Sequence, residues 1–226
     1  MIQHVYERTK RAKLIDNVVV ATDHEKIAET VKAFGGEVIM SPAELPTGSD
    51  RIAWTAGKLP HADIIVNVQG DEPLISPQMI DQAVEPMIND PSIAVNTLAK
   101  KISDPKDVLN PNVVKVVVEN NGYALYFSRS PIPNIRDQKD QTKWLLEHSY
   151  LKHFGIYVYR KEALLKFAGW KESSLEHAEK LEQLRFLENG YRIKVTLTEF
   201  DTIPIDTEDD ARRVREILLK AQPEFY

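Results

Sequence analysis

The sequence contains no cysteine among its 226 residues. This absence excludes disulfide bonds, thiolate nucleophiles and cysteine-ligated zinc, and it is typical of a protein from a reducing compartment. No apolar run approaches the roughly 20 residues that a membrane-spanning helix needs, and no apolar signal-peptide core follows Met1. We therefore expect a cytoplasmic protein without membrane insertion.

Positive charge is scarce relative to negative charge. The chain has 29 Lys and Arg residues against 34 Asp and Glu residues, a net charge of −5, and its pI is about 5.7. This balance argues against a nucleic-acid-binding protein, which follows the phosphate backbone with an excess of positive charge. Hydrophobic residues make up 42% and charged residues 28%, as in ordinary globular proteins, and the length allows one large α/β domain or two small ones.

The first 70 residues alternate between two kinds of segment. Runs rich in β-branched residues predict strands at 17–23, 37–40 and 62–69. Periodic apolar residues predict helices at 24–36 and 50–59. This order is typical of parallel βαβ units, in which ligands bind beyond the carboxyl ends of the strands. We therefore expect a site where Gln69, Gly70 and Asp71 follow the third strand.

The rest of the chain departs from this alternation. Two β-rich runs flank Asn120–Asn121–Gly122, which predicts an antiparallel hairpin of the kind that builds a lid or a dimer face. A helix is expected from Ser76–Pro77. Further strands are expected at 153–160 and 191–199, and further helices at 173–190 and 206–221. The pattern predicts a Rossmann-like α/β fold: a mostly parallel sheet, helices on both faces and a hairpin insertion.

Three acidic residues fit two interpretations each. Asp71 and Glu72 either form a solvated turn after a strand or supply oxygen ligands to a hard cation such as Mg²⁺. Asp206 either caps the last helix or supplies a second carboxylate. No one of these residues decides between structure and chemistry by itself.

Five other polar residues are equally ambiguous. Glu182 and Gln183 fit the polar face of a helix, and His153 fits a structural role in a strand. Arg129 and Arg136 flank the loop segment "SPIPNI". Each arginine is either solvated or clamps a substrate carboxylate.

Eight segments of the chain occur in a recognisable order and spacing: "VATDHEKIAETVKAFGGEVIM", "TGSDRIA", "IVNVQGDEPLI", "NPNVVKVV", "GYALYFSRSPIP", "HFGIYVYR", "SSLEHAEKLEQLRFLENG" and "IDTEDDARRVR". Together they resemble the motifs of the 3-deoxy-manno-octulosonate (KDO) cytidylyltransferases, also called CMP-KDO synthetases. The resemblance covers nearly the whole chain from Ile2 onward, and "VQGDEP", "YALYFSR" and "LEQLR" are its most specific parts. The resemblance implies the fold of the nucleotide-diphospho-sugar transferases.

The resemblance also implies a reaction and a set of site residues. CTP and KDO would give CMP-KDO and pyrophosphate for lipopolysaccharide biosynthesis, with Mg²⁺ as the cofactor and with in-line attack of the KDO hydroxyl on the α-phosphate. By position, Asp71 and Asp206 resemble the catalytic metal ligands. The nucleotide loop corresponds to Gly48, Ser49 and Arg51, with Thr47 and Ser49 exchanged relative to the family wording. The sugar pocket corresponds to Gln69, Arg129, His153, Glu182 and Gln183.

The sequence departs from the family at its beginning. The family has a strand and a basic loop of the form "PARxxSxRLPGKPL", about 20 residues that grip the triphosphate, before the helix that begins here with "MIQHVYERTKRA". We expect a start upstream of Met1, through a misassigned codon or a trimmed chain, rather than a genuine truncation. Two alternatives stay open: a non-catalytic remnant that binds KDO or a partner subunit, and a cytidylyltransferase for another sugar acid such as sialic acid or amino-KDO.

The resemblance finally implies an organisation for the chain. We expect one cytidylyltransferase domain over residues 1–226 and a homodimer. Residues 113–160 would form an insertion that carries the hairpin, the dimer face and part of the sugar site.

Overall fold

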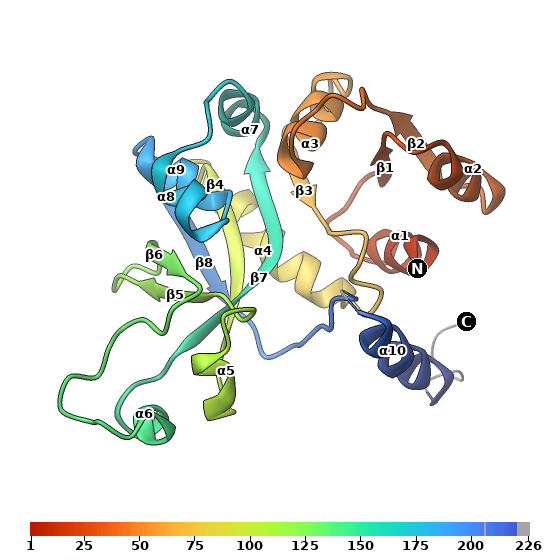
Figure 1. The fold of residues 1–226 in the computed structure, drawn as a ribbon. Helices are drawn as coiled ribbons and strands as arrows, with labels where there is room; N and C mark the ends of the chain where they lie inside the picture. Colours follow the sequence, from red (N-terminus) through yellow and green to blue (C-terminus); the bar gives the residue numbers. More distant parts are fainter. Residues whose placement is uncertain (206, 221–226) are drawn as a thin grey trace.

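The computed structural model describes residues 1–205 and 207–220 and has an α/β fold (Figure 1). Its helices are α1 (Ile2–Lys10), α2 (Glu25–Ala33), α3 (Gly48–Gly57), α4 (Pro77–Asn89), α5 (Pro105–Leu109), α6 (Trp144–Glu147), α7 (Lys161–Ala168), α8 (Ser174–Glu179), α9 (Gln183–Glu188) and α10 (Glu208–Lys220), with a 3₁₀ turn at Gln141–Lys143. Its strands are β1 (Val19–Thr22), β2 (Glu37–Met40), β3 (Ile64–Asn67), β4 (Val95–Lys101), β5 (Lys115–Val118), β6 (Ala124–Ser128), β7 (Leu151–Arg160) and β8 (Ile193–Leu197).

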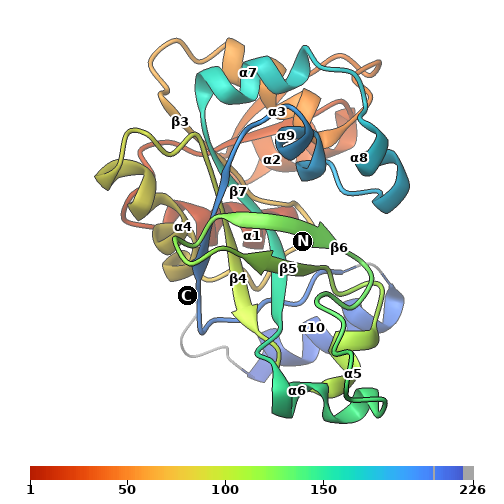
Figure 2. The same cartoon turned by 90° about the vertical axis from the view of Figure 1, so that its left-hand side faces the viewer.

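The long strand β7 organises the larger sheet (Figure 2). It pairs antiparallel with β3, β4 and β5, while β5 also pairs antiparallel with β6 in the predicted hairpin. Strand β8 lies parallel to β4 at the other edge. Strands β1 and β2 form a separate parallel pair, which stands with α2 to one side of the larger sheet in Figure 1.

The predicted α/β class is confirmed, but the sheet differs from the expected mostly parallel one. Among the described residues, the pairs β1–β2 and β4–β8 are parallel, and the other pairs are antiparallel. The cause is β7, which runs opposite to β3, β4 and β5 and lies between them. The sequence pattern of a buried strand does not reveal its direction, so this arrangement was not predictable from the pattern.

Apolar side chains cover both faces of the larger sheet, as predicted. Along β4, Val95 and Ala99 pack into a layer with α3, α7 and α9, while Leu98 packs into the opposite layer with α1 and α4. Along β7, Tyr157 and Tyr159 face the first layer, and Val158 faces the second. This alternation is the period of two that a strand imposes. The alternation also places every second residue of these strands on the face of the first layer. Polar residues on that face lie at the edge of the layer, where the cavity described below opens.

The predicted single helix at 173–190 is broken into α8 and α9. Lys180 follows α8 in the left-handed conformation, with φ 54° and ψ 50°. Contacts with the end of β6 accompany the break: the Glu179 carboxylate accepts hydrogen bonds from the Ser128 hydroxyl and the Arg129 backbone N–H, and the Arg129 side chain donates to the Glu179 carbonyl. The break lets α9 begin at Gln183, beside the sheet.

Two other findings concern the helices. The predicted last helix at 206–221 corresponds to α10, with positions 206 and 221 outside the described residues. Among the helices of the described chain, none combines the length and apolar character needed to cross a membrane.

Candidate active site

A cavity of about 790 Å³ lies against β7, α9 and the loop that follows β3. It brings together residues that are far apart in the sequence. The predicted site residues in its wall are Ser49, Gln69, Arg129, His153, Glu182 and Gln183. The broken helix and the central position of β7 explain how these side chains meet.

The remaining predicted residues lie elsewhere. Gly48 and Arg51 are in the first turn of α3, and the Arg51 guanidinium makes a two-point ion pair with Asp23, with N–O distances of 2.6 and 2.8 Å. This pairing lowers the pKa of Asp23. Asp71 is half-buried outside the cavity wall, whereas its neighbour Glu72 is in the wall.

The predicted partner of Asp71 cannot be placed in the same way. Asp206 lies outside the described residues. The residue before it in the sequence, Ile205, donates its backbone N–H to the Asp71 carbonyl at 2.9 Å. No group of three or more Asp, Glu, His or Cys side chains with metal-binding geometry occurs within residues 1–205 and 207–220. A carboxylate such as Asp71 is nevertheless a suitable donor for Mg²⁺, which commonly takes one or two carboxylates together with substrate phosphates.

His153 presents a neutral imidazole to the cavity. Its Nε2 lies 2.9 Å from the Thr97 hydroxyl, and its ring packs edge-on against Phe127 with the ring centroids 5.0 Å apart. Burial lowers the pKa of His153 to about 3, because a low-dielectric environment disfavours the charged ring. At neutral pH this side chain therefore acts as a hydrogen-bonding group and not as a cation.

Arg129 is held at the cavity by neutral groups. Its guanidinium donates to the carbonyls of Glu179 at 2.8 Å, Pro111 at 3.1 Å and Lys180 at 3.4 Å. Carbonyl partners fix the direction of the side chain without neutralising its charge. The arrangement suits recognition of a ligand carboxylate or phosphate.

Lys115 supports this part of the wall and was not among the predicted residues. Its buried ammonium donates to the carbonyls of Asn110 at 2.9 Å, Val113 at 2.6 Å and Arg129 at 2.6 Å. Desolvation lowers the pKa of Lys115. The signal that could have identified it is a lysine inside the continuous β-branched run "VVKVVV", a pattern that is typical of a strand buried on both faces.

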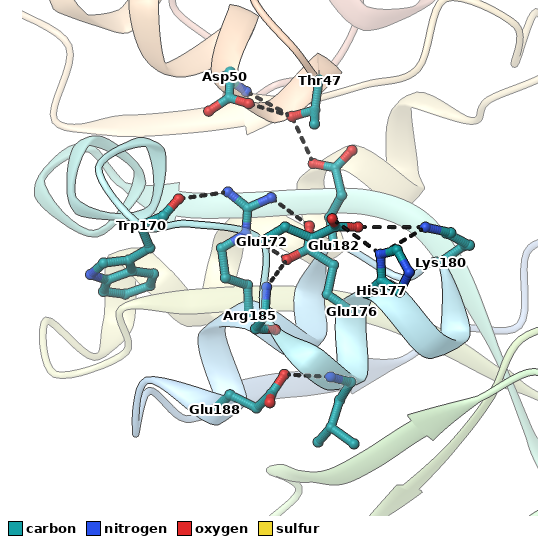
Figure 3. A network of polar contacts seen from close by, with 12 residues as sticks. Thr47, Asp50, Trp170, Glu172, Glu176, His177, Lys180, Glu182, Arg185 and Glu188 are labelled. Carbon is teal, nitrogen blue, oxygen red and sulfur yellow. Dashed lines mark hydrogen bonds and ion pairs between the residues drawn. The ribbon is translucent and has the colours of Figure 1, made fainter.

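Glu182 is tied to α3 by the polar network in Figure 3. The Thr47 hydroxyl lies 3.2 Å from the Glu182 carboxylate and 2.9 Å from the Asp50 carboxylate, and it accepts the Asp50 backbone N–H as the N-cap of α3. Beyond it, Arg185 and Glu176 form a buried ion pair, with 2.7 Å between Nε and Oε2. The Glu176 carboxylate raises the pKa of Arg185.

The cavity also contains polar atoms that lack a partner. Within the described part of the chain, the Tyr157 hydroxyl and the Gln183 side-chain nitrogen are buried and make no hydrogen bond. Burial, with Tyr159 and Glu182 nearby, raises the pKa of Tyr157, so its hydroxyl keeps its proton. Each such group costs about 1–3 kcal/mol unless a ligand or water pairs with it. Tyr157 was not predicted, although it shares its strand face with His153.

The wall therefore offers one guanidinium, a neutral imidazole, amides, a carboxylate and a phenol. This donor set complements a ligand that carries a carboxylate and several hydroxyl groups. A cavity of this chemistry, at the edge of an α/β sheet, is typical of an enzyme that binds a polar sugar-like substrate.

Comparison with solved structures defines the class of protein. The structure of 4-diphosphocytidyl-2C-methyl-D-erythritol synthase from Anaerococcus prevotii is 14% identical, with a TM-score of 0.61 over 96% of this chain and 89% of that chain. At this identity the likeness concerns the fold alone. The fold is that of the nucleotidyltransferase-like α/β proteins.

More similar proteins define the family. A family model described as Cytidylyltransferase matches residues 1–194. The 3-deoxy-manno-octulosonate cytidylyltransferase of Geotalea daltonii is 54% identical over 222 residues, covering 96% of this chain and 87% of the relative. The enzyme of the same name from Geobacter metallireducens is 53% identical over 226 residues, covering 98% and 89%. A solved CMP:2-keto-3-deoxy-manno-octonic acid synthetase complexed with CTP is 40% identical with a TM-score of 0.89, covering 97% and 87%. The chain belongs to the 3-deoxy-manno-octulosonate cytidylyltransferases, and the resemblance inferred from the motifs is confirmed.

Proposed function

We propose that this protein transfers CMP from CTP to KDO, forming CMP-KDO and pyrophosphate, and that KDO binds in the cavity beside β7. The observation that carries the proposal is the gathering of Gln69, Arg129, His153 and Gln183 in one wall, in a chain of this family. Dependence on Mg²⁺, a homodimer with residues 113–160 at its face, a cytoplasmic location and a role in lipopolysaccharide biosynthesis belong to the same proposal.

The contacts of each side chain suggest its role toward KDO. Arg129, whose guanidinium is held by carbonyls, would bind the KDO carboxylate. Gln183 and Tyr157 would pair their buried nitrogen and hydroxyl with sugar hydroxyls, which recovers the cost of leaving them without partners. Glu182, held by Thr47, would accept a hydrogen bond from another sugar hydroxyl.

The nucleotide and the metal would bind next to the sugar. We assign Gly48, Ser49 and Arg51 to the nucleotide, since they lie in the first turn of α3 and the first turn of an α-helix is suited to bind phosphate. Asp71 and Asp206 would hold Mg²⁺, and the bound ion would neutralise charge on the phosphates during an in-line displacement. Positioning of the sugar hydroxyl is the part of the catalysis that falls to the cavity residues.

The test is pyrophosphate release from CTP in the presence of Mg²⁺, with and without KDO. The proposal predicts release that requires KDO, and no release when sialic acid replaces it. Turnover of sialic acid in place of KDO would reassign the substrate. A protein that binds KDO without releasing pyrophosphate would contradict the proposed transfer and favour a binding role.

A further inference from the structure

We propose that Thr97 is a positioning residue that fixes the tautomer of His153, so that the imidazole presents Nδ1 to KDO as a hydrogen-bond acceptor. The identity of the ligand rests on the proposed function. The tautomer rests on contacts within the protein alone. The two parts of the inference can therefore fail separately.

A bulge in β7 brings Thr97 to its position. Strand β4 pairs Thr97 with Tyr157 but the next residue, Leu98, with Phe154, so β7 has two extra residues at this point. Such a bulge interrupts the ladder of backbone hydrogen bonds and re-aims nearby side chains. The carbonyls of Ile156 and Phe154 consequently face the Thr97 side chain, with Oγ1–O distances of 2.7 and 3.3 Å.

The count of protons at Thr97 decides the tautomer. The Thr97 hydroxyl is buried and carries a single proton, while a carbonyl oxygen can only accept. The 2.7 Å contact with the Ile156 carbonyl requires that proton, because two oxygen atoms at this distance repel without a hydrogen between them. The Thr97 oxygen is then left as an acceptor, so His153 Nε2, which is 2.9 Å away, must donate.

The consequence for the cavity is a defined acceptor. A neutral imidazole with its proton on Nε2 has a lone pair on Nδ1, and burial keeps this ring neutral by lowering its pKa to about 3. Nδ1 makes no hydrogen bond to the described residues and is not among their buried atoms that lack a partner, so it is accessible from the cavity. It accepts a hydrogen bond from a ligand donor, and a KDO hydroxyl provides one.

The experiment measures the tautomer directly. Long-range ¹H–¹⁵N spectra of protein with labelled imidazole rings distinguish Nε2–H from Nδ1–H, and loss of one signal in His153→Gln assigns it among the 6 histidines. We expect Nε2–H in the wild type and in Thr97→Ser. Thr97→Val, which keeps the shape and removes the hydroxyl, should lose this preference. Thr196→Val, a matched change on β8, should keep it. Nδ1–H in the wild type, or an unchanged tautomer in Thr97→Val, would overturn the inference, and the wild-type spectrum decides even if a variant does not fold.

Steady-state kinetics separate the two parts of the inference. Thr97→Val should raise the KM for KDO about tenfold, with the KM for CTP unchanged, and Thr97→Ser should restore the KDO value. If the tautomer changes in Thr97→Val while the KM for KDO does not, the role of Nδ1 toward KDO is wrong. Absence of KDO-dependent turnover in the wild type would instead refute the proposed function and leave the tautomer result standing.

Discussion

At the residue scale, the cavity depends on charged groups that are satisfied by carbonyl oxygens rather than by opposite charges. Lys115 and Arg129 each make three such contacts, six in all, with the backbone carbonyls of residues 110, 111, 113, 129, 179 and 180. This leaves positive charge at the wall without a competing carboxylate in these contacts. A ligand anion can therefore bind without first breaking an ion pair.

Replacing Lys115 tests how much this anchoring contributes. In Lys115→Met the stem is kept, but three carbonyls lose their donor, so we expect the free energy of unfolding to fall by about 2 kcal/mol. Urea unfolding measures the change, and Lys106→Met, at an exposed lysine, is the control. A loss no larger than that of the control would show that the three contacts do not stabilise the fold.

The buried imidazole predicts a pH dependence of stability. The pKa of His153 is about 3 in the folded protein and near 6.5 in the unfolded chain. Only the unfolded state takes up the proton between these values, so the contribution of His153 is complete above pH 6.5. It decreases by about 1.4 kcal/mol for each pH unit below that value, until the pH approaches the folded-state pKa. Urea unfolding at pH 7 and pH 5 measures how much the free energy of unfolding falls between these values. The fall should be smaller in His153→Gln than in the wild type, and equal falls would contradict the lowered pKa of His153.

Asp71 carries the prediction about the metal. Asp71→Asn keeps the size of the side chain and removes the charge, so we expect turnover to fall on the order of 100-fold. The Mg²⁺ concentration that gives half-maximal rate should increase. Asp63→Asn, at an exposed carboxylate before β3, is the control. Full Mg²⁺-dependent activity in Asp71→Asn would remove Asp71 from the metal site.

At the element scale, the break between α8 and α9 brings residues 180–183 into the wall of the cavity. The sequence predicted one helix because Leu175, Ala178, Leu181 and Leu184 keep helical spacing across the break. Nothing local signals an interruption, since the left-handed residue is Lys180 rather than glycine. The break coincides with contacts between Glu179 and the end of β6, which are distant in the sequence. Contacts of this kind override local propensity and are not visible in the pattern.

The left-handed backbone conformation of Lys180 suggests a stabilising substitution. Lys180→Gly removes the Cβ that disfavours this conformation, and we expect the free energy of unfolding to rise by about 0.5–1 kcal/mol. The lost ion pair with Glu172 is exposed and contributes little. Thermal unfolding of Lys180→Gly and of Lys180→Ala separates the lost ion pair from the relief of backbone strain. Both variants lose the ion pair, but only the glycine variant relieves the strain and gains stability. A lower Tm for the glycine variant would show that the strain is not at Lys180.

Other elements were predictable because their signals are local. The strands that became β1, β2 and β3, the hairpin at Gly122 and the helix that begins after Ser76 all follow from short-range patterns. The pairing of β7 was not predictable from the sequence, because the direction and register of this strand depend on the bulge opposite Thr97 and on distant strands. Thr97 itself was missed for the same reason.

At the scale of the whole molecule, two layers of helices hold β7 between them and bring six of the predicted site residues to one cavity. The family motifs indicated these residues, but no pattern in the sequence could give their mutual positions. The roles assigned to all the site residues stay predictions; Gly48, Arg51 and Asp71 lie outside the cavity wall, and Asp206 lies outside the described residues. A second cavity of about 960 Å³ is lined in part by Thr47, Asp50 and Arg185 of the polar network.

The most direct test of the central claim, that KDO binds in the cavity beside β7, is the pair of KM values for KDO and CTP in Gln183→Leu. The substitution keeps the volume and removes the buried amide, which makes no hydrogen bond through its nitrogen to the described residues. We predict a rise of about tenfold in the KM for KDO and an unchanged KM for CTP, with Gln141→Leu, at an exposed position, as the control. An unchanged KM for KDO, or a rise confined to CTP, would contradict the placement of the sugar in this cavity.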